Sequence, residues 1–213
     1  MAYKVGVLGS GEVGKTLAKG CRDHGYQTCI ASRTREKLKE FAQAENIEFG
    51  TMKEAAADSD IIILAVAGIG VVDLVTSLKD TLKNKIVIDA CNPIEGAPID
   101  GVVQFFQLPG GLSLMEHLQN LAPDAKFVKA FNSVGSGRMV NPKFAEGRPS
   151  MFICGNDAEA KGVVSELLEK FGWDTFDMGG ARSAYSIEQL CVLWCTRGFN
   201  EGKWDHAFKL LTK

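Results

Sequence analysis

The sequence lacks the features that mark several large classes of protein. Its 24 basic and 26 acidic residues leave a formal net charge of −2, which gives no electrostatic reason to expect nucleic acid or an anionic membrane as a partner. No apolar run approaches the roughly 20 residues that a membrane-spanning helix needs. The apolar stretch Val5–Leu8 near the start is too short, and too interrupted by glycine, for the core of a secretion signal. We therefore expect a cytoplasmic protein that binds neither nucleic acid nor a membrane.

Cysteine pairs of the kind that bind metals or carry out redox chemistry are also missing. The six cysteines are scattered, and none forms a C-x-x-C pair. This usage predicts reduced thiols that serve mostly as small core residues. Cys191 and Cys195 stand four apart on a predicted helix and would share a face, but no histidine or carboxylate joins them at ligand spacing. We interpret this pair as core packing and predict no metal site.

What the sequence does contain is a regular alternation of apolar, β-branched runs with helical stretches. The 213 residues, 46% of them hydrophobic, suffice for one large domain or one domain with a small extension. The runs Ile61–Val66 and Ile86–Ile88 show no polar alternation. Such strands are buried on both faces, as in a parallel sheet covered by helices. The pattern predicts the α/β class with a mainly parallel sheet.

The predicted elements extend almost from end to end of the chain. Strands are expected at Lys4–Leu8, Gln27–Ala31, Asp60–Val66, Lys85–Ala90, Lys126–Phe131, Ser150–Cys154 and Asp174–Asp177. Helices are expected at Glu12–His24, Thr34–Ala44, Met52–Ala57, Gly70–Leu78, Leu114–Leu121, Ala158–Phe171 and Ser183–Thr196. The short stretch Ile47–Gly50 is ambiguous. Prolines and glycines between Asn92 and Pro109 predict a long irregular connection, and connections of that length are often functional.

A glycine-rich turn connects the first strand to the first helix. It matches G-x-G-x-x-G, and its residues are Gly9, Ser10, Gly11, Glu12, Val13 and Gly14. In this context the first glycine allows a tight turn, the second lets the backbone approach a pyrophosphate, and the third allows close helix–strand packing. Free N–H groups at the helix start then face the phosphates. We predict a dinucleotide site on a Rossmann-type, doubly wound sheet; the alternative is a glycine-rich turn without a ligand.

The residues after the second predicted strand indicate which dinucleotide binds. An NAD site usually has Asp or Glu about 20 residues beyond the turn, bonded to the ribose hydroxyls. The first acid after the second predicted strand is Glu36. The residues around it are of types that can bind a phosphate through hydrogen bonds, charge-assisted for the two cations: Ser32, Arg33 and Thr34 before it and Lys37 after it. These residues predict NADP(H). Alternatively, the cations only solvate a helix start, where positive charge is mildly unfavourable.

With these residues in view, the chain resembles the family of NADPH:coenzyme F420 oxidoreductases, and most closely its short bacterial branch. The resemblance covers nearly the whole chain. It depends on the turn, on Ser32–Thr34, on Lys129–Asn132, on Met151–Asp157, and on Leu193-Trp194 with His206–Leu211. The N-terminal domain is also similar to that of STEAP-type metalloreductases and of pyrroline-5-carboxylate reductases.

The resemblance implies a division of the chain and a reaction. Residues 1–140 would form the NADP-binding Rossmann domain, and residues 141–213 a small α/β extension that closes a cleft over the nicotinamide. A small-molecule redox acceptor, coenzyme F420 or a flavin, would bind in that cleft and exchange hydride between its C5 and the nicotinamide C4. Proximity and ring stacking supply most of such catalysis, so no catalytic side chain is predicted.

Ligands of open α/β sheets bind beyond the carboxyl ends of the strands. On this basis the remaining predicted cofactor contacts follow the fourth, fifth and sixth strands: Val66, Ala67, Ala90, Asn92 and Asn132. The small residues would let a planar ring approach the backbone, or they simply pack tightly. The two asparagines would hold the carboxamide or the second substrate, or they cap their own turns.

Other interpretations remain open from the sequence. A non-catalytic module that senses NADP(H) would share the donor site. A reductase of small imines or carbonyls is disfavoured, because such enzymes continue with an all-helical region whereas this chain resumes strands. The aromatic C-terminal part would cover the cleft or form a dimer face, and we expect a homodimer. His24 is expected to end a helix, and His206 to pack among aromatic residues.

Overall fold

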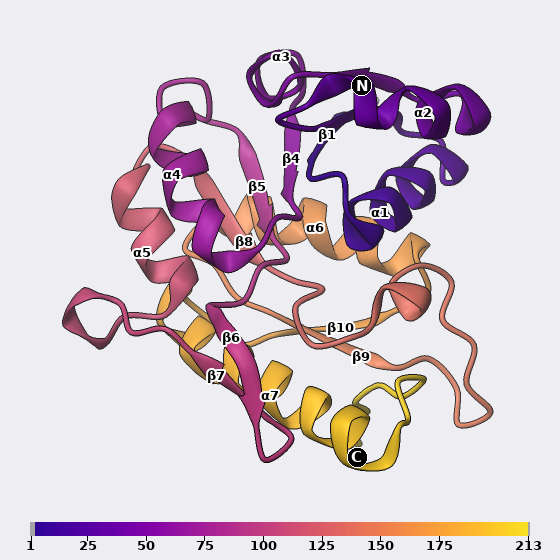
Figure 1. The fold of residues 1–213 in the computed structure, drawn as a ribbon, viewed down its shortest axis with the longest axis vertical. Coiled ribbons are helices and arrows are strands. Elements are labelled where there is room, and N and C mark those ends of the chain that lie inside the picture. Colours follow the sequence, from indigo (N-terminus) through magenta and orange to yellow (C-terminus); the bar gives the residue numbers. More distant parts are fainter. Residues whose placement is uncertain (1–2, 213) are drawn as a thin grey trace.

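The computed structural model describes residues 3–212 (Figure 1). The strands are β1 (Lys4–Leu8), β2 (Gln27–Ala31), β3 (Glu48–Gly50), β4 (Ile61–Leu64), β5 (Ile86–Asp89), β6 (Ile94–Ile99), β7 (Val102–Phe105), β8 (Lys126–Lys129), β9 (Ser150–Ile153) and β10 (Asp174–Asp177). The α-helices are α1 (Glu12–Asp23), α2 (Lys39–Glu45), α3 (Met52–Ala57), α4 (Gly68–Leu78), α5 (Leu114–Leu121), α6 (Ala158–Lys170) and α7 (Ala184–Glu201). Short 3₁₀ helices are η1 (Arg35–Leu38), η2 (Pro109–Gly111), η3 (Ser136–Arg138) and η4 (Ala181–Ser183).

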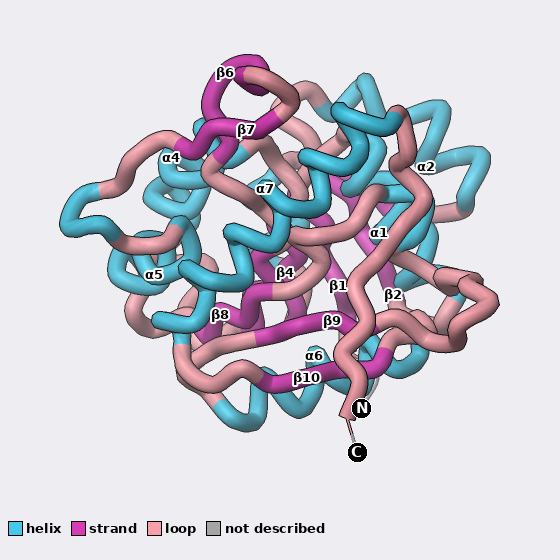
Figure 2. The backbone as a smooth tube through the Cα atoms, turned by 90° about the horizontal axis from the view of Figure 1, so that it is seen from below, coloured by secondary structure: helices cyan, strands magenta, loops and turns pink. Residues whose placement is uncertain are grey.

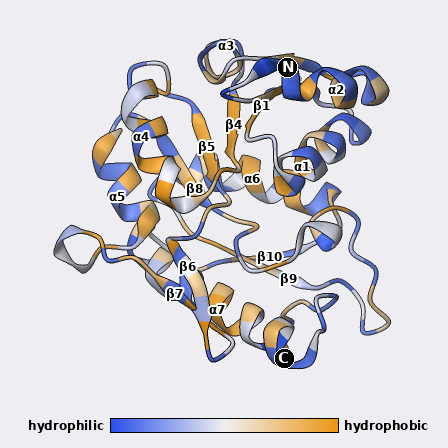
Figure 3. Cartoon of the chain, viewed as in Figure 1, coloured by the Kyte–Doolittle hydropathy of each residue, from blue (hydrophilic) through white to orange (hydrophobic). Residues whose placement is uncertain are grey.

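The centre of the molecule is a six-stranded parallel sheet in the order β3-β2-β1-β4-β5-β8. All four residues of β4 are buried, as are all four of β5, so both faces of these strands are covered. Figure 3 shows the hydrophobic colour concentrated in these central strands. The predicted mainly parallel, doubly wound sheet is therefore confirmed. Its strand order reverses between β1 and β4, the position at which open α/β sheets bind ligands.

Helices cover both faces of this sheet. On one face the core includes Leu17 of α1 together with Val164 and Leu168 of α6, packed against odd positions of the strands such as Val7 and Ile63. On the other face the core is built from α3, α4, α5 and the first turns of α7, and its buried side chains include Ala56, Val75, Leu118 and Ile187. The alternation of strand side chains between these two cores follows from the period of two along a strand.

The C-terminal part of the chain contains a second, smaller parallel pair of strands. Ser150 of β9 lies opposite Asp174 of β10, and α6 connects the two strands. A single antiparallel bridge between Lys129 and Cys154 joins β8 to the residues just after β9. Figure 2 shows α7 and the extended tail on the side of β9 that faces the viewer. The predicted small α/β extension is present, and its apolar residues share one core with the Rossmann strands. The boundary at residue 140 stays a prediction.

The predicted irregular connection from Asn92 to Pro109 is wrong in its first part. Residues 94–105 form an antiparallel hairpin, β6–β7, with an irregularity between Glu95 and Ile99. Its turn, Asp100-Gly101, has positive φ at both residues (49° and 77°), which is the conformation of a type I′ turn. The hairpin packs on α7, where Gly101 lies against Asn200. This loop therefore supports the C-terminal helix.

The other differences concern the ends of elements. The predicted helix Thr34–Ala44 is divided into η1 and α2, and the ambiguous stretch Ile47–Gly50 contains the edge strand β3. The last helix extends beyond its predicted end at Thr196 to Glu201, where Gly202 adopts a left-handed conformation with φ 67°. Within residues 3–212, no helix is both long and apolar enough to cross a membrane.

Candidate functional site

The glycine-rich turn has the geometry that a pyrophosphate site requires. The Gly9 N–H donates to the Ala31 carbonyl (3.0 Å), which fixes the turn against the end of β2. Gly9 has φ of 152°, and a side chain there would overlap the Ala65 carbonyl. Gly11 lies in open space, with no heavy atom within 4 Å of the position that a Cβ would take. The backbone at Gly11 is therefore open to a ligand, whereas Gly9 is closed by the protein itself.

Helix α1 begins at this turn with unpaired N–H groups. Gly11 is its N-cap residue, and no side chain caps the helix. The first N–H groups of an uncapped helix and its positive dipole end favour a bound anion. Glu12 is exposed and Val13 half-buried at this end. The predicted contacts of Gly9, Ser10, Gly11, Glu12 and Val13 with the dinucleotide stay predictions, and the local geometry fits a diphosphate.

The residues predicted to bind the 2′-phosphate lie next to this turn. Ser32 is buried, and its hydroxyl donates to the hydroxyl of Ser10 (3.2 Å) and accepts from the Thr34 N–H (3.2 Å). Arg33 is exposed and forms no hydrogen bond or ion pair with any residue in the range 3–212. Lys37 is likewise exposed on η1. The structure thus brings the two predicted halves of the donor site together and leaves cationic groups available beside them.

The nearby Arg35 has a different role. Its guanidinium lies 5.1 Å from the centre of the Phe49 ring, over the edge strand β3. A guanidinium over an aromatic face is held by a cation–π attraction. Arg35 is therefore engaged with the protein, and Arg33 is the arginine of this segment that remains free to meet a phosphate.

The loops after β4, β5 and β8 meet at the carboxyl edge of the sheet. Val66 and Ala90 are half-buried there, and Ala67 is exposed at the start of α4. The Asn92 Nδ2 donates to the Asn132 carbonyl (2.7 Å), and the Asn132 Nδ2 donates to the Asn92 Oδ1 (3.1 Å). The two asparagine amides are thus used to join the loops to each other. Their predicted contact with the carboxamide stays a prediction.

One atom of this pair remains without a partner. The Asn132 Nδ2 also donates to the Ile187 carbonyl on α7 (3.0 Å), but the Asn132 Oδ1 is buried and accepts no hydrogen bond from the residues described. A buried oxygen without a donor is costly, so such groups usually mark a functional or strained position. Asn132 therefore links the carboxyl edge of the sheet to the C-terminal helix.

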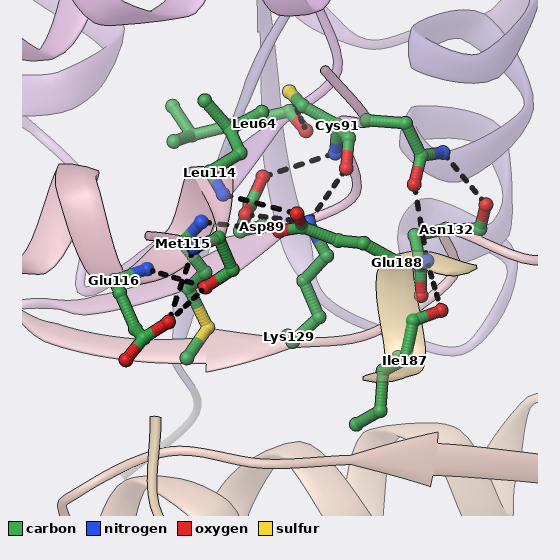
Figure 4. A network of polar contacts seen from close by, with 12 residues as sticks. Leu64, Asp89, Cys91, Leu114, Met115, Glu116, Lys129, Asn132, Ile187 and Glu188 are labelled. Atoms are coloured by element: carbon green, nitrogen blue, oxygen red, sulfur yellow. Dashed lines mark hydrogen bonds and ion pairs between the residues drawn. The ribbon is translucent and has the colours of Figure 1, made fainter. Parts of the chain in front are cut away.

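A buried cluster of charged side chains lies directly beneath these loops, and the sequence analysis did not identify it. Lys129, at the end of β8, is fully buried, and its ammonium group lies 2.9 Å from carboxylate oxygens of both Asp89 and Glu188 (Figure 4). It also donates to the Cys91 carbonyl (2.6 Å). These three residues, Asp89, Lys129 and Glu188, are called the Lys129 cluster below.

The ionisation of Lys129 is set by two opposing effects. Burial disfavours the charged ammonium and is the largest influence, but the charges and hydrogen bonds of Asp89 and Glu188 outweigh it and hold the pKa above the usual value for lysine. The lysine therefore keeps its proton and its positive charge at neutral pH.

The aromatic C-terminal segment packs on the loop that follows β8. The Trp194 ring lies against Gly135, and its Nε1 donates to the His206 carbonyl (2.8 Å). The His206 ring stacks on the Trp194 ring, with centroids 5.0 Å apart. The Trp204 ring also contacts Trp194, with centroids 5.3 Å apart. The expectation that His206 packs among aromatic residues is confirmed. His24 is confirmed as the residue that ends α1.

The cysteines follow their predicted role with one difference. Five are buried, and none is in a disulfide. Cys191 and Cys195 do share a face of α7, with sulfurs 3.9 Å apart, but Cys195 is only half-buried. No group of three or more His, Cys, Asp or Glu side chains within the described range is arranged to hold a metal ion.

Comparisons with known proteins show the family of the chain. A family model described as NADP oxidoreductase, coenzyme F420-dependent, matches residues 4–93. An F420-dependent NADP reductase of Methanocaldococcus jannaschii is 30% identical over 206 residues, covering 89% of this chain and 90% of that protein. The crystal structure of a candidate F420-dependent NADP reductase from Arthrobacter sp. FB24 is similar with a TM-score of 0.91 at 28% identity, covering 99% of this chain and 100% of that one.

A second group of relatives is longer. Metalloreductase STEAP3 of Rattus norvegicus is 31% identical over 191 residues, which make up 89% of this chain but 36% of the metalloreductase. This chain thus spans about a third of the length of the metalloreductases that it matches.

Proposed function

The chain belongs to the family of coenzyme F420-dependent NADP oxidoreductases, and from this premise we propose that it transfers hydride between NADP(H) and a flat-ring acceptor. The acceptor class that fits is a deazaflavin of the F420 type or a flavin. The observation that carries the proposal is the open backbone at Gly11 beside the unengaged Arg33. Together they offer a cradle for a pyrophosphate and a cation for a 2′-phosphate.

Each part of the NADP(H) molecule has a matching group on this chain. The α1 N-terminus would face the pyrophosphate, and Ser32, Arg33 and Thr34 would face the ribose phosphate. No carboxylate precedes Glu36 at the end of β2, and this favours NADP(H) over NAD(H) because a carboxylate there would repel the additional phosphate. The nicotinamide would then rest at the carboxyl edge near Val66, Ala67 and Ala90.

The chemical step makes few demands on side chains. Hydride moves directly from one ring to another when the two rings are stacked in contact, and the cofactors carry the chemistry themselves. The protein's contribution is to hold the rings together and to keep water out. Its loops at the carboxyl edge are fixed by the Asn92–Asn132 pair and by the Lys129 cluster, and Asn132 ties them to α7, on which the β6–β7 hairpin packs.

An anaerobic stopped-flow experiment tests this proposal. NADPH is mixed with the protein and with an oxidised deazaflavin, FMN or FAD, and its absorbance at the nicotinamide band is followed. We expect saturable oxidation of NADPH with the deazaflavin and slower oxidation with the flavins. Tight NADPH binding without oxidation by any of the three would contradict the enzyme and favour the sensing module instead.

The homodimer expected from the sequence remains a proposal supported by the surface. A groove of about 460 Å³ runs between α7, β9 and the tail, and apolar side chains line it, including Leu190, Leu193, Phe208 and Leu210. Leu193 is 60% exposed, which is unusual for a leucine on a long packed helix. Light scattering measures the molar mass in solution of the wild type and of Leu193→Asp. We expect the wild type to be a dimer and Leu193→Asp to be a monomer.

A further inference from the structure

Helix α7 is fixed to the sheet by a buried carboxylate. Glu188 lies in its second turn and is 2% exposed. Its Oε1 accepts from the Lys129 ammonium (2.9 Å) and the Met115 N–H (3.1 Å), and its Oε2 accepts from the Leu114 N–H (3.0 Å). Figure 4 shows this side chain reaching the lysine and the start of α5 together. One carboxylate therefore joins α7, β8 and α5.

The rest of the cluster extends to the loops of the carboxyl edge. Asp89 binds Lys129 with one oxygen and accepts the Cys91 N–H with the other (3.0 Å). Lys129 donates to the Cys91 carbonyl, one residue before Asn92. A second polar contact, from the Asn132 amide to the Ile187 carbonyl, joins α7 to the same loops. The position of α7 is thereby coupled to the backbone on which the nicotinamide would rest.

The cost of this arrangement indicates that stability is not its main contribution. Each buried charge loses its hydration, and a well-packed apolar set of the same volume is often as stable or more stable. The cluster holds two negative charges and one positive charge, and the N-terminus of α5 offsets about half of the excess. A charged hydrogen bond is directional, whereas an apolar contact is not. The cluster therefore restrains how β5, β8, α5 and α7 are placed relative to one another.

We infer that Glu188 is a positioning residue: by binding Lys129 and the start of α5, it holds α7 against the carboxyl edge and so sets the distance between donor and acceptor rings. This inference rests on the proposed function. Glu188 touches neither ring in this account and acts through the loops and through α7. A displacement of about 1 Å at a reacting centre can cost about 100-fold in rate, so even a small shift of α7 is measurable.

The test uses single-turnover hydride transfer from bound NADPH to a saturating deazaflavin. Glu188→Gln keeps the shape of the side chain but replaces one carboxylate oxygen with an amide nitrogen, so at least one of the groups that donate to Glu188 loses its acceptor. Glu188→Asp keeps the charge on a shorter side chain. Glu201→Gln is the matched control, because it makes the same change at an exposed position of the same helix. Each rate constant is measured well below the unfolding temperature, together with the dissociation constant for NADPH.

We expect the rate constant to fall about 10- to 100-fold in Glu188→Gln and less in Glu188→Asp, with NADPH affinity within about twofold of the wild type. A purely structural role would reduce the amplitude, through loss of folded protein, and leave the rate constant unchanged. Wild-type rate constants in both variants would overturn the inference, as would an equal loss in Glu201→Gln. If Glu188→Gln does not fold, Glu188→Asp decides.

Failure of the proposed function is distinguishable from failure of this inference. If the wild type transfers hydride to none of the acceptors, the proposed function fails. Amide hydrogen exchange then tests separately whether Glu188 holds α7 against the carboxyl edge. Faster exchange in α7 of Glu188→Gln than in Glu201→Gln, with NADPH bound, supports that role. Equal protection of α7 in the two variants overturns it.

Discussion

Gly14 packs directly on Gly9, so closely that a methyl group on Gly14 would overlap the Gly9 carbonyl oxygen. Gly11, between them in the turn, has no such neighbour, and its backbone (φ −78°, ψ −178°) is extended and open to any residue. The three glycines of the motif therefore have separable roles. Two are required by the fold, and one is required only by a ligand that approaches the backbone.

Gly11→Ala is accordingly expected to fold as the wild type does and to bind NADPH at least about tenfold more weakly, a loss of about 1.4 kcal/mol. The added methyl projects into the space that a pyrophosphate would fill. Thermal unfolding and fluorescence titration with NADPH measure the two quantities. Gly14→Ala is the comparison variant and should lower the unfolding temperature. Unchanged NADPH affinity in Gly11→Ala would show that the turn holds no pyrophosphate.

Arg33→Ala should separate the two dinucleotides. Charge-assisted hydrogen bonds contribute about 1.5–3 kcal/mol, so the dissociation constant for NADPH should rise about 10- to 150-fold while that for NADH changes little. Arg197→Ala removes the same charge from the exposed face of α7 and serves as the control. A wild-type protein that binds NADH as tightly as NADPH would contradict the assignment of Ser32–Thr34 to a 2′-phosphate.

The cysteines should differ sharply in reactivity. Burial raises the pKa values of Cys21 and Cys154 to about 12, so their thiolates are scarce at neutral pH. The hydrogen bond from Cys191 holds the pKa of Cys195 below its usual value, and Cys195 is half-buried. Iodoacetamide labelling of the native protein, read by peptide mass spectrometry between pH 6 and 8, should modify Cys195 first. Cys195→Ser should abolish the fast phase; equal labelling of Cys21 would refute this ranking.

Much of the fold was predictable because local signals and long-range packing agree. The apolar runs Ile61–Leu64 and Ile86–Ile88 form strands that are buried on both faces, as their lack of polar alternation predicts. The β6–β7 hairpin was missed because Gly96 and Pro98 indicate a loop. The dipeptide Asp100-Gly101 between apolar residues was the signal that would have found it. Pro98 is tolerated because the hairpin has only two strands.

The site was predictable only in its local part. The turn and Ser32–Thr34 are short motifs whose meaning depends on neighbouring residues, and they meet as expected. The Lys129 cluster joins residues separated by 40 and 59 positions. The strand Lys126–Lys129 has a lysine at each end and the predicted helix Ser183–Thr196 contains one glutamate, but the sequence does not say which of these charges is buried or which partner each one finds. Asp89 meets Lys129 because β5 and β8 pair in that register, and Glu188 meets it because α7 packs on α5.

Deuterium labelling tests most directly whether the protein transfers hydride from NADPH to the acceptor. NADPH carrying deuterium at either face of C4 is incubated anaerobically with the protein and oxidised deazaflavin, and the reduced product is analysed by mass spectrometry. We expect the product to gain one deuterium from one of the two labelled forms and none from the other. NADPH oxidation that leaves the deazaflavin unlabelled by both forms, or no oxidation at all, would contradict the account.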